Sequence, residues 1–238
     1  APVIEAYGLM AAGVFGSTFA LTETLVRATP LILTGLAAAV AFRARLYNIG
    51  GEGQLYLGAL MAVVVGTGAI EAPAVVMVPL VLLAGALGGA LGMLGPAWLK
   101  ARLGVDEVVT TLLLNFVILL FVQMMLEGAL QDPMGMGWPQ SSPVIDEATL
   151  PRLVERMRVH AGLPLALLLA LALQGVMTRM VWGLKVRAVG ENAAAARHAG
   201  LGVRRTLLGV GLLSGALAGL AGAGEVAGLK GYLTADLS

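Results

Sequence analysis

The sequence predicts an all-α fold, a polytopic transmembrane helix bundle with glycine-broken or short helices. Hydrophobic residues make up 58% of the 238 residues and charged residues only 12%, whereas about a quarter of the residues in soluble domains are charged. The apolar residues lie in long uncharged runs, and about 20 such residues cross a bilayer as a helix. Those runs cover 53–70, 72–99, 108–126, 161–178 and 206–224. We therefore predict a single transmembrane domain over residues 1–238.

The expected spans follow from these runs and their flanking residues. They lie at about 28–47, 53–70, 73–99, 106–127, 161–183 and 206–224. Pro30 suits the start of the first span, because a helix start does not need the N–H that proline lacks. Residues 5–27 are apolar, but their uncharged part is short for a span, so we expect an interfacial or re-entrant helix there. Because Ala1 stands in place of an initiator Met, a preceding span is expected to be missing.

Basic residues set the expected orientation, because Lys and Arg collect in short cytoplasmic loops. The turn containing Glu71 and the mixed-charge segment 129–160 are then expected outside. Within that outer segment, we predict a short amphipathic helix near 148–158 at the membrane surface. The expected inner residues follow the first apolar segment (28–42), follow the long run 72–99 or fill the loop 184–205. They are Arg43, Arg45, Lys100, Arg102, Lys185, Arg187, Arg197, Arg204 and Arg205.

The heptapeptide Asn48-Ile-Gly-Gly-Glu-Gly-Gln54 is a polar interruption between two apolar segments. A charged side chain in hydrocarbon costs about 2.5–3.5 kcal/mol on insertion scales, and three glycines weaken any helix that contains them. Transporters use such breaks to aim helix ends at a substrate, and non-helical backbone inside a membrane needs protein or a cavity around it. A tight cytoplasmic hairpin after Arg43 and Arg45 explains the same residues, and we weigh the two interpretations about equally.

A polar stripe on the span 106–127 is the second candidate site. Glu107, Thr111 and Asn115 are spaced by four residues, which places them on one face of a helix. Polar residues on a spanning helix face the bundle or a water-filled path rather than lipid. They can also join helices, at about 0.6 kcal/mol for each hydrogen bond. We favour the joining role for Thr111 and the pathway for Asn115.

The inner loop 184–205 predicts a short helix. Asn192 can cap it through its side-chain oxygen, four alanines propagate it, and Arg197 and His198 suit its C-terminal turn. Gly200 can end it. An orientation loop needs only a few charges, so a complete helix favours a docking element. The simpler alternative is a loop that only sets the orientation.

Glycines at four-residue spacing predict close helix packing rather than a function. The pair Gly224-Glu225 that follows these glycines weakly resembles Gly51-Glu52 and suggests a second, pseudo-repeated break. The four-residue sets are Gly211, Gly215 and Gly219; Gly85 and Gly89; and Gly88 and Gly92.

Enzyme signatures are absent from the sequence. It holds two histidines and no cysteine, which leaves no HExxH pair and no thiolate metal site. Ser214 lies outside any GxSxG motif, and no GxxxxGK[ST] loop is present for ATP. We predict no metal and no cofactor bound by this chain. The net charge of +1 gives no reason to expect nucleic acid as a partner.

Residues 30–68, PLILTGLAAAVAFRARLYNIGGEGQLYLGALMAVVVGTG, resemble the signature region of bacterial ABC importer permeases of the simple-sugar and nucleoside type. These permeases belong to the superfamily that also holds branched-chain amino acid permeases. Three further stretches agree with that family in order: VDEVVTTLLLN over 105–115, LKVRAVGENAAAARHAGL over 184–201 and LSGALAGLAG over 213–222. Family members usually have further spans at both ends, so the resemblance implies a chain truncated at both ends.

The resemblance implies a multi-pass permease subunit in a bacterial inner membrane, with no enzymatic activity of its own. Its expected partners are cytoplasmic ATPase subunits that bind ATP, a second permease subunit, an extracytoplasmic substrate-binding lipoprotein and membrane lipid. The expected cargo is a nucleoside or a related simple sugar. A permease for branched-chain amino acids and an ion-coupled secondary transporter are the alternatives. We expect the ATPase to contact Arg187, Glu191, Asn192, Arg197 and His198, and the translocation path or gate to include Asn48, Glu52, Gln54, Thr111 and Asn115.

Overall fold

The computed structural model describes residues 2–68, 70, 72–154 and 156–236, and helices dominate this part of the chain. Five of them are long and apolar enough to cross a membrane: α2, α4, α5, α6 and the continuous stretch formed by α9 and η2. The elements in order are α1 (Val3–Phe15), α2 (Thr18–Arg43), α3 (Gly51–Gly66), α4 (Ala74–Leu103), α5 (Glu107–Leu126), the 3₁₀ turn η1 (Asp146–Ala148), α6 (Gly162–Arg179), α7 (Val181–Glu191), α8 (Ala193–His198), α9 (Val203–Glu225) and the π-helical turn η2 (Val226–Lys230). The predicted all-α, polytopic helix bundle is confirmed.

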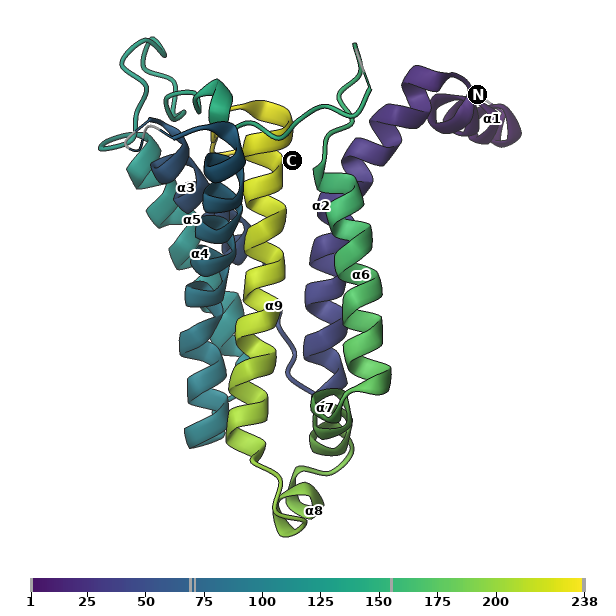
Figure 1. The fold of residues 1–238 in the computed structure, drawn as a ribbon, viewed down its shortest axis with the longest axis vertical. Coiled ribbons are helices and arrows are strands. Elements are labelled where there is room, and N and C mark those ends of the chain that lie inside the picture. The colour runs from purple at the N-terminus through teal and green to yellow at the C-terminus, as the bar shows by residue number, and fades with distance from the viewer. Residues whose placement is uncertain (1, 69, 71, 155, 237–238) are drawn as a thin grey trace.

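Helix α9 lies at the centre of the bundle, with α2, α3 and α4 packed around it (Figure 1). Small residues make these contacts close, as the glycine spacing predicted. A Cβ atom added to Gly219 would meet the backbone of Gly85 and Gly89, and one added to Gly215 would meet the Gly89 carbonyl. Gly58 of α3 lies against the backbone of Gly219 from another side. Backbone packs directly on backbone at the point where three helices meet.

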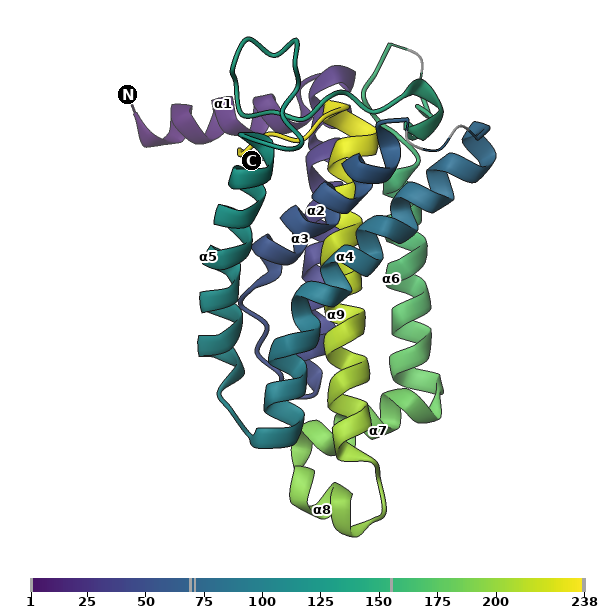
Figure 2. The same cartoon turned by 90° about the vertical axis from the view of Figure 1, so that its left-hand side faces the viewer.

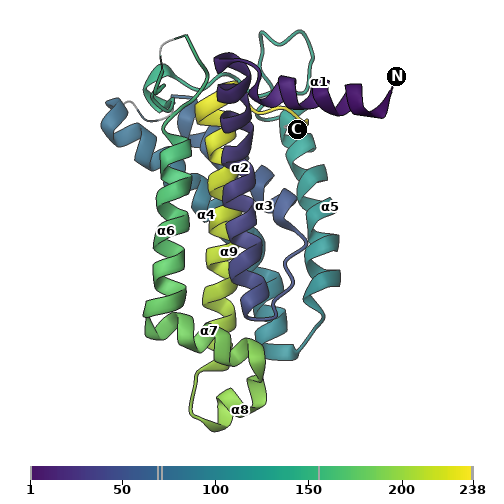
Figure 3. The same ribbon diagram turned by 90° about the vertical axis from the view of Figure 1, so that its right-hand side faces the viewer.

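Helix α2 begins at Thr18, so the prediction that Pro30 starts a helix is wrong. Ser17 caps the actual start by accepting the N–H of Ala20 at 3.0 Å. Residues 18–27 extend this helix, so the predicted separate helix over 5–27 is wrong for that part. Proline interrupts one helical hydrogen bond, and spanning helices tolerate that loss when neighbouring groups compensate. The upper part of α2 leans away from its lower part (Figure 1), while α1 lies across the bundle axis (Figure 3).

The basic residues predicted to be inner lie on elements at the end of the bundle that carries α7 and α8, and that end is at the bottom of Figure 1. Arg43 ends α2, Lys100 and Arg102 lie in the last turn of α4, and Arg197 lies in α8. The segment between α5 and α6 lies at the opposite end (Figure 2). The two groups of loops thus lie at opposite ends of the bundle, and the positive-inside rule predicts that the α7–α8 end is the cytoplasmic one. The turn at Glu71 lies outside the described residues.

The outer segment 127–161 contains no α-helix in its described residues, so the amphipathic helix predicted near 148–158 is wrong. Tertiary contacts replace that helix. Leu150 is buried and donates its N–H to the carbonyl of Ala227 at 2.7 Å, and Leu153 donates to Val159 at 2.8 Å. Pro151 follows Leu150 and has no N–H to offer a helix. The segment therefore packs against η2, which continues α9.

Candidate functional site

The chain between α2 and α3 turns back into the bundle. Helix α2 ends at Arg43 on the basic end, and the non-helical segment 44–50 then runs back alongside α5 before α3 begins at Gly51 (Figure 2). Asn48 is buried, and Gln54 is only 2% exposed. The heptapeptide therefore forms a break inside the bundle, and the alternative interpretation as a cytoplasmic hairpin is wrong.

The polar stripe of α5 supplies hydrogen-bond partners for this non-helical backbone. Glu107 Oε1 accepts the N–H of Tyr47 at 3.2 Å, and Thr111 Oγ1 accepts the N–H of Ile49 at 3.2 Å. Asn115 Oδ1 accepts the N–H of Gly53 one step further along. Backbone donors inside a membrane protein are costly if left unpaired. The stripe thus replaces the helical hydrogen bonds that the break gives up.

The spacing of the stripe matches the geometry of the segment beside it. Four residues of an α-helix rise about 6 Å, and two residues of extended chain cover about 6.6 Å. The distance from Glu107 to Thr111 along α5 therefore nearly equals the distance from Tyr47 to Ile49 along the extended segment. Four-residue spacing on α5 is what a neighbouring extended chain requires, and it need not indicate a water-filled path.

A second set of hydrogen bonds closes the heptapeptide on itself. Asn48 Nδ2 donates to Gln54 Oε1 at 2.7 Å, and Gln54 Nε2 donates back to Asn48 Oδ1 at 2.9 Å. Asn48 Nδ2 also donates to Ser214 Oγ of α9 at 3.0 Å, and Ser214 donates to the carbonyl of Ala37 at 2.8 Å. Sequence reasoning missed Ser214 as a member of the site. Its signal was a lone hydroxyl in a run of small apolar residues.

Glu107 also forms the buried end of an ion pair. Its Oε2 lies 2.5 Å from Lys100 Nζ, and the carboxylate side chain is 4% exposed. The pair joins the C-terminal turn of α4 to the N-terminal turn of α5. Glu107 therefore connects α4, α5 and the non-helical segment 44–50, because its Oε1 accepts the N–H of Tyr47.

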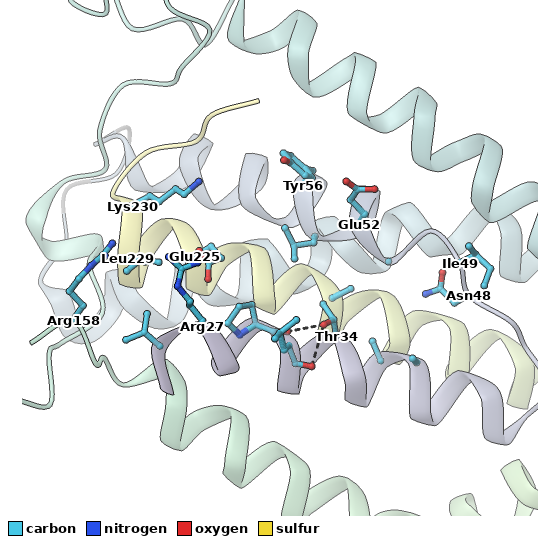
Figure 4. Close-up of a pocket in the computed structure, with 18 of the residues that line it drawn as sticks. Arg27, Thr34, Asn48, Ile49, Glu52, Tyr56, Arg158, Glu225, Leu229 and Lys230 are labelled. Carbon is cyan, nitrogen blue, oxygen red and sulfur yellow. Dashed lines mark hydrogen bonds between the residues drawn. The ribbon is translucent and has the colours of Figure 1, made fainter. Parts of the chain in front are cut away.

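A cavity of about 930 Å³ lies beside the break, between α2, α3 and α9 (Figure 4). Of the predicted path residues, Asn48 and Glu52 line it, whereas Gln54, Thr111 and Asn115 do not. Asn115 Nδ2 instead donates to Glu52 Oε2 at 3.1 Å and orients that carboxylate. Glu52 lies in the first turn of α3, where the helix dipole favours negative charge. At this end, the cavity thus presents a carboxylate and an amide beside apolar residues such as Ile49 and Leu55.

Charged residues at the other end of the cavity were not predicted as a site. Arg158 of the outer segment pairs with Glu23 of α2 at 3.3 Å. Arg27, Glu225 and Lys230 line the same region, and Figure 4 shows Glu225 lying between the basic side chains. The signal in the sequence was a set of charges that directly flank apolar runs. Glu52 and Glu225 line one cavity, but Glu225 ends α9 at a π-helical turn rather than at a return of the chain like 44–50.

Comparison with known proteins identifies the family. The model of the branched-chain amino acid transport system / permease component family matches residues 20–235. The chain belongs to this permease family. No solved structure matches the chain.

Relatives of this permease are named as transport proteins. The chain is 43% identical to the glucose ABC transporter permease protein TsgB13 of Haloferax volcanii, over 98% of this chain and 63% of the relative. It is 38% identical to the guanosine ABC transporter permease protein NupP of Bacillus subtilis, over 97% of this chain and 66% of the relative. With the nucleoside ABC transporter permease protein NupB of Lactococcus lactis, the values are 32%, 87% and 59%. The chain thus spans about three fifths of the length of these curated relatives.

The cytoplasmic end of this permease carries the predicted short helix. Asn192 Oδ1 accepts the N–H groups of Ala194 and Ala195, both at 3.0 Å, and caps α8 as predicted. Arg197 and His198 are exposed on α8, which lies at the tip of the molecule (Figure 1). Glu191 ends α7 and is also exposed, close to α8 in the chain.

Arg187 lies apart from this exposed group. It belongs to α7, is half-buried and donates Nη1 to the carbonyl of Met177 at the end of α6. The five residues expected to contact an ATPase therefore do not form one surface. Arg197 and His198 face outward, Asn192 supports their helix, and Arg187 turns toward the bundle.

Proposed function

We propose that this chain is the transmembrane core of a permease subunit in an ATP-driven importer for nucleosides or related simple sugars. The cavity beside the broken helix is the observation that carries the proposal. Ligand sites in proteins are mostly apolar pockets with a few placed polar groups, and half-helix ends point at the substrate in many transporters. The relatives named for guanosine, nucleosides and glucose support this cargo class.

Within this proposal, the predicted path residues divide into two roles. Asn48 and Glu52 both line the cavity. Glu52 offers its carboxylate to the hydroxyl groups of a passing solute, whereas the amide of Asn48 is already bonded to Gln54 and Ser214 and shapes the wall. Thr111 and Asn115 hold the break in shape through the N–H groups of Ile49 and Gly53. Gln54 supports Asn48 from behind. A substitution at Thr111 or Asn115 is then expected to affect transport by changing the shape of the cavity wall at Asn48 and Glu52.

ATP binding belongs to other subunits in this proposal, since the chain has no GxxxxGK[ST] loop. Cytoplasmic ATPase subunits dock on α8, whose exposed Arg197 and His198 lie at the tip. A second permease subunit, an extracytoplasmic substrate-binding lipoprotein and the surrounding lipid complete the assembly. The chain itself binds no cofactor. Closure of the ATPases moves α8, and α9 carries that movement to the cavity wall because it follows α8 directly and contributes Ala218 and Glu225 there.

The test is uptake by the full-length protein with its ATPase and permease partners in liposomes, with binding protein added outside. We expect uptake of radiolabelled guanosine or glucose only when ATP is supplied to the ATPase side. Leucine and riboflavin are the comparison cargoes, because the family description names branched-chain amino acids and one relative is a probable riboflavin import permease protein. Uptake driven by a proton or sodium gradient without ATP would instead assign the chain to the secondary transporters.

A further inference from the structure

A second, smaller cavity is lined by residues of α2, α6 and α7. Figure 3 shows α6 on the opposite side of α2 from α3. Its volume is about 200 Å³. One part of its wall is apolar, formed by Leu36, Val40, Ala170 and Leu173. The rest is polar, with Arg43, Gln174, Thr178 and Arg187. The cavity therefore joins a hydrocarbon-like surface to two guanidinium groups at the edge of the spanning helices.

Neither arginine has a carboxylate partner in the described part of the chain, where the ion pairs are Lys100–Glu107 and Arg158–Glu23. Arg43 has no side-chain hydrogen bond among the same residues. Arg187 Nη1 is held by the carbonyl of Met177, which leaves the other N–H groups of its guanidinium for another acceptor. Two cations sharing one cavity repel each other, so an anion between them stabilises both.

We propose that this cavity binds the phosphate of an anionic phospholipid. Basic pockets between spanning helices on the cytoplasmic side suit anionic headgroups, because the cytoplasmic leaflet is where such lipids lie. Arg43 and Arg187 contact the phosphate, Gln174 contributes a further donor, and the acyl chains lie along the membrane face of α6, which exposes Leu167, Leu168 and Leu171. Phosphatidylcholine carries the same phosphate, but its trimethylammonium group is repelled by the two guanidinium groups, so the site favours a headgroup with net negative charge.

The site has a structural consequence that is independent of the cargo. Arg43 is the last residue of α2, directly before the segment that returns to the cavity, and Arg187 lies on α7, which leads to α8. A phosphate bridging both residues joins the start of the broken segment to the docking end. Anionic lipid is then expected to stabilise the fold even when no transport takes place.

The test is lipid binding to the full-length protein purified in detergent, with bound lipids counted by native mass spectrometry during titration. We expect phosphatidylglycerol to bind at least about tenfold more tightly than phosphatidylcholine, and Arg43→Gln to weaken phosphatidylglycerol binding about fivefold. Arg179→Gln is the matched control, because Arg179 lies at the same end of α6 and does not line the cavity. Its binding is expected to equal that of the unaltered protein.

Two further variants and one competitor keep the result interpretable. Arg187→Gln is expected to weaken phosphatidylglycerol binding, but it also removes the contact to Met177. If that variant unfolds, Arg187→Lys replaces it, because lysine retains the positive charge. Arg187→Lys is expected to keep most of the lipid preference. Inorganic phosphate at equal concentration is expected not to displace phosphatidylglycerol, and full displacement would show a site for free anions. Equal lipid binding by Arg43→Gln, Arg179→Gln and the unaltered protein would overturn the proposal.

Discussion

The backbone N–H of Ile49 donates to the side-chain oxygen of Thr111 at 3.2 Å, so a helical residue supplies the partner that a broken helix lacks. Thr111 Oγ1 donates in turn to the carbonyl of Glu107 at 2.6 Å, which fixes the direction of its lone pairs. Thr111 is 1% exposed. The threonine side chain is therefore shielded within the bundle, while Ile49 itself lines the cavity.

Thr111→Val is expected to destabilise the protein by about 0.5–1.5 kcal/mol, because the N–H of Ile49 loses its side-chain acceptor. Thr110→Val is the matched control, since Thr110 Oγ1 bonds only to carbonyls of its own helix. The measurement is the thermal transition temperature of the full-length protein in detergent. Equal transition temperatures for the two variants would show that the stripe does not hold the segment.

Gly219→Ala is expected to lower stability by at least about 1–3 kcal/mol, the usual cost of overpacking a core. The new Cβ would meet the backbone of α4 at Gly85 and Gly89, which cannot move aside as a side chain can. Gly224→Ala lies on the same helix with open space around its Cβ, and it is expected to be neutral or slightly stabilising. The same thermal measurement compares them, and an equal loss in both variants would contradict the predicted contact.

His160 is expected to make stability depend on pH. It lies in the outer segment, it is buried, and burial lowers its pKa from the ordinary value. Its Nδ1 also accepts the N–H of Gly162 at 3.1 Å, which a protonated nitrogen cannot do. The unfolded chain therefore takes up a proton more readily than the folded one, so the stabilising contribution is present above the unfolded pKa of about 6.5 and is lost as pH falls below it.

The check is the thermal transition measured from about pH 7.5 to about pH 5. We expect it to fall across this range in the unaltered protein and to fall less in His160→Asn, whose amide oxygen can still accept from Gly162. His198→Asn removes an exposed histidine and is expected to leave the slope unchanged. If His160→Asn and His198→Asn share the slope of the unaltered protein, His160 is not the titrating group.

Arg197→Glu is expected to uncouple ATP hydrolysis from uptake, because it reverses charge on the proposed docking helix. Hydrolysis by the assembled transporter and uptake of cargo are measured in the same liposomes. The ratio of cargo transported to ATP hydrolysed is expected to fall at least about tenfold. Arg179→Glu, also exposed at the cytoplasmic end, is the control, and an unchanged ratio in Arg197→Glu would remove α8 from the coupling.

Local signals in the sequence predicted much of the fold. Long apolar runs coincide with helices long enough to cross a membrane, except that 53–70 falls on the 16-residue α3. Asn192 identified the start of α8, because capping depends on a few neighbouring residues. The prediction that Pro30 starts a helix was wrong, because a proline inside a spanning helix is tolerated where packing compensates. The predicted helix near 148–158 failed for a related reason: burial of Leu150 and its bond to Ala227 outweigh local periodicity.

The site was harder to predict because its contacts join distant parts of the chain. The heptapeptide was visible as a polar interruption, but Arg43 and Arg45 beside it fit a hairpin as well as a return into the bundle. The sequence favoured the transport path for Asn115, and the structure shows hydrogen bonds from its side chain to Gly53 and Glu52 beside the break. Residue spacing predicts which side chains share one face of a helix. It does not predict which segment packs against that face, because that depends on tertiary structure.

Accessibility of Ile49 tests most directly whether the broken segment lines the transport path. The sequence contains no cysteine, so a single Ile49→Cys in an otherwise cysteine-free, full-length transporter reports on one position that lines the cavity. We predict that a charged, membrane-impermeant thiol reagent labels it and that cargo with ATP changes the labelling rate at least about threefold, whereas Phe116→Cys on the exposed face of α5 reacts slowly under all conditions. Labelling of Ile49→Cys that matches Phe116→Cys and ignores cargo and ATP would contradict a path along residues 48–52.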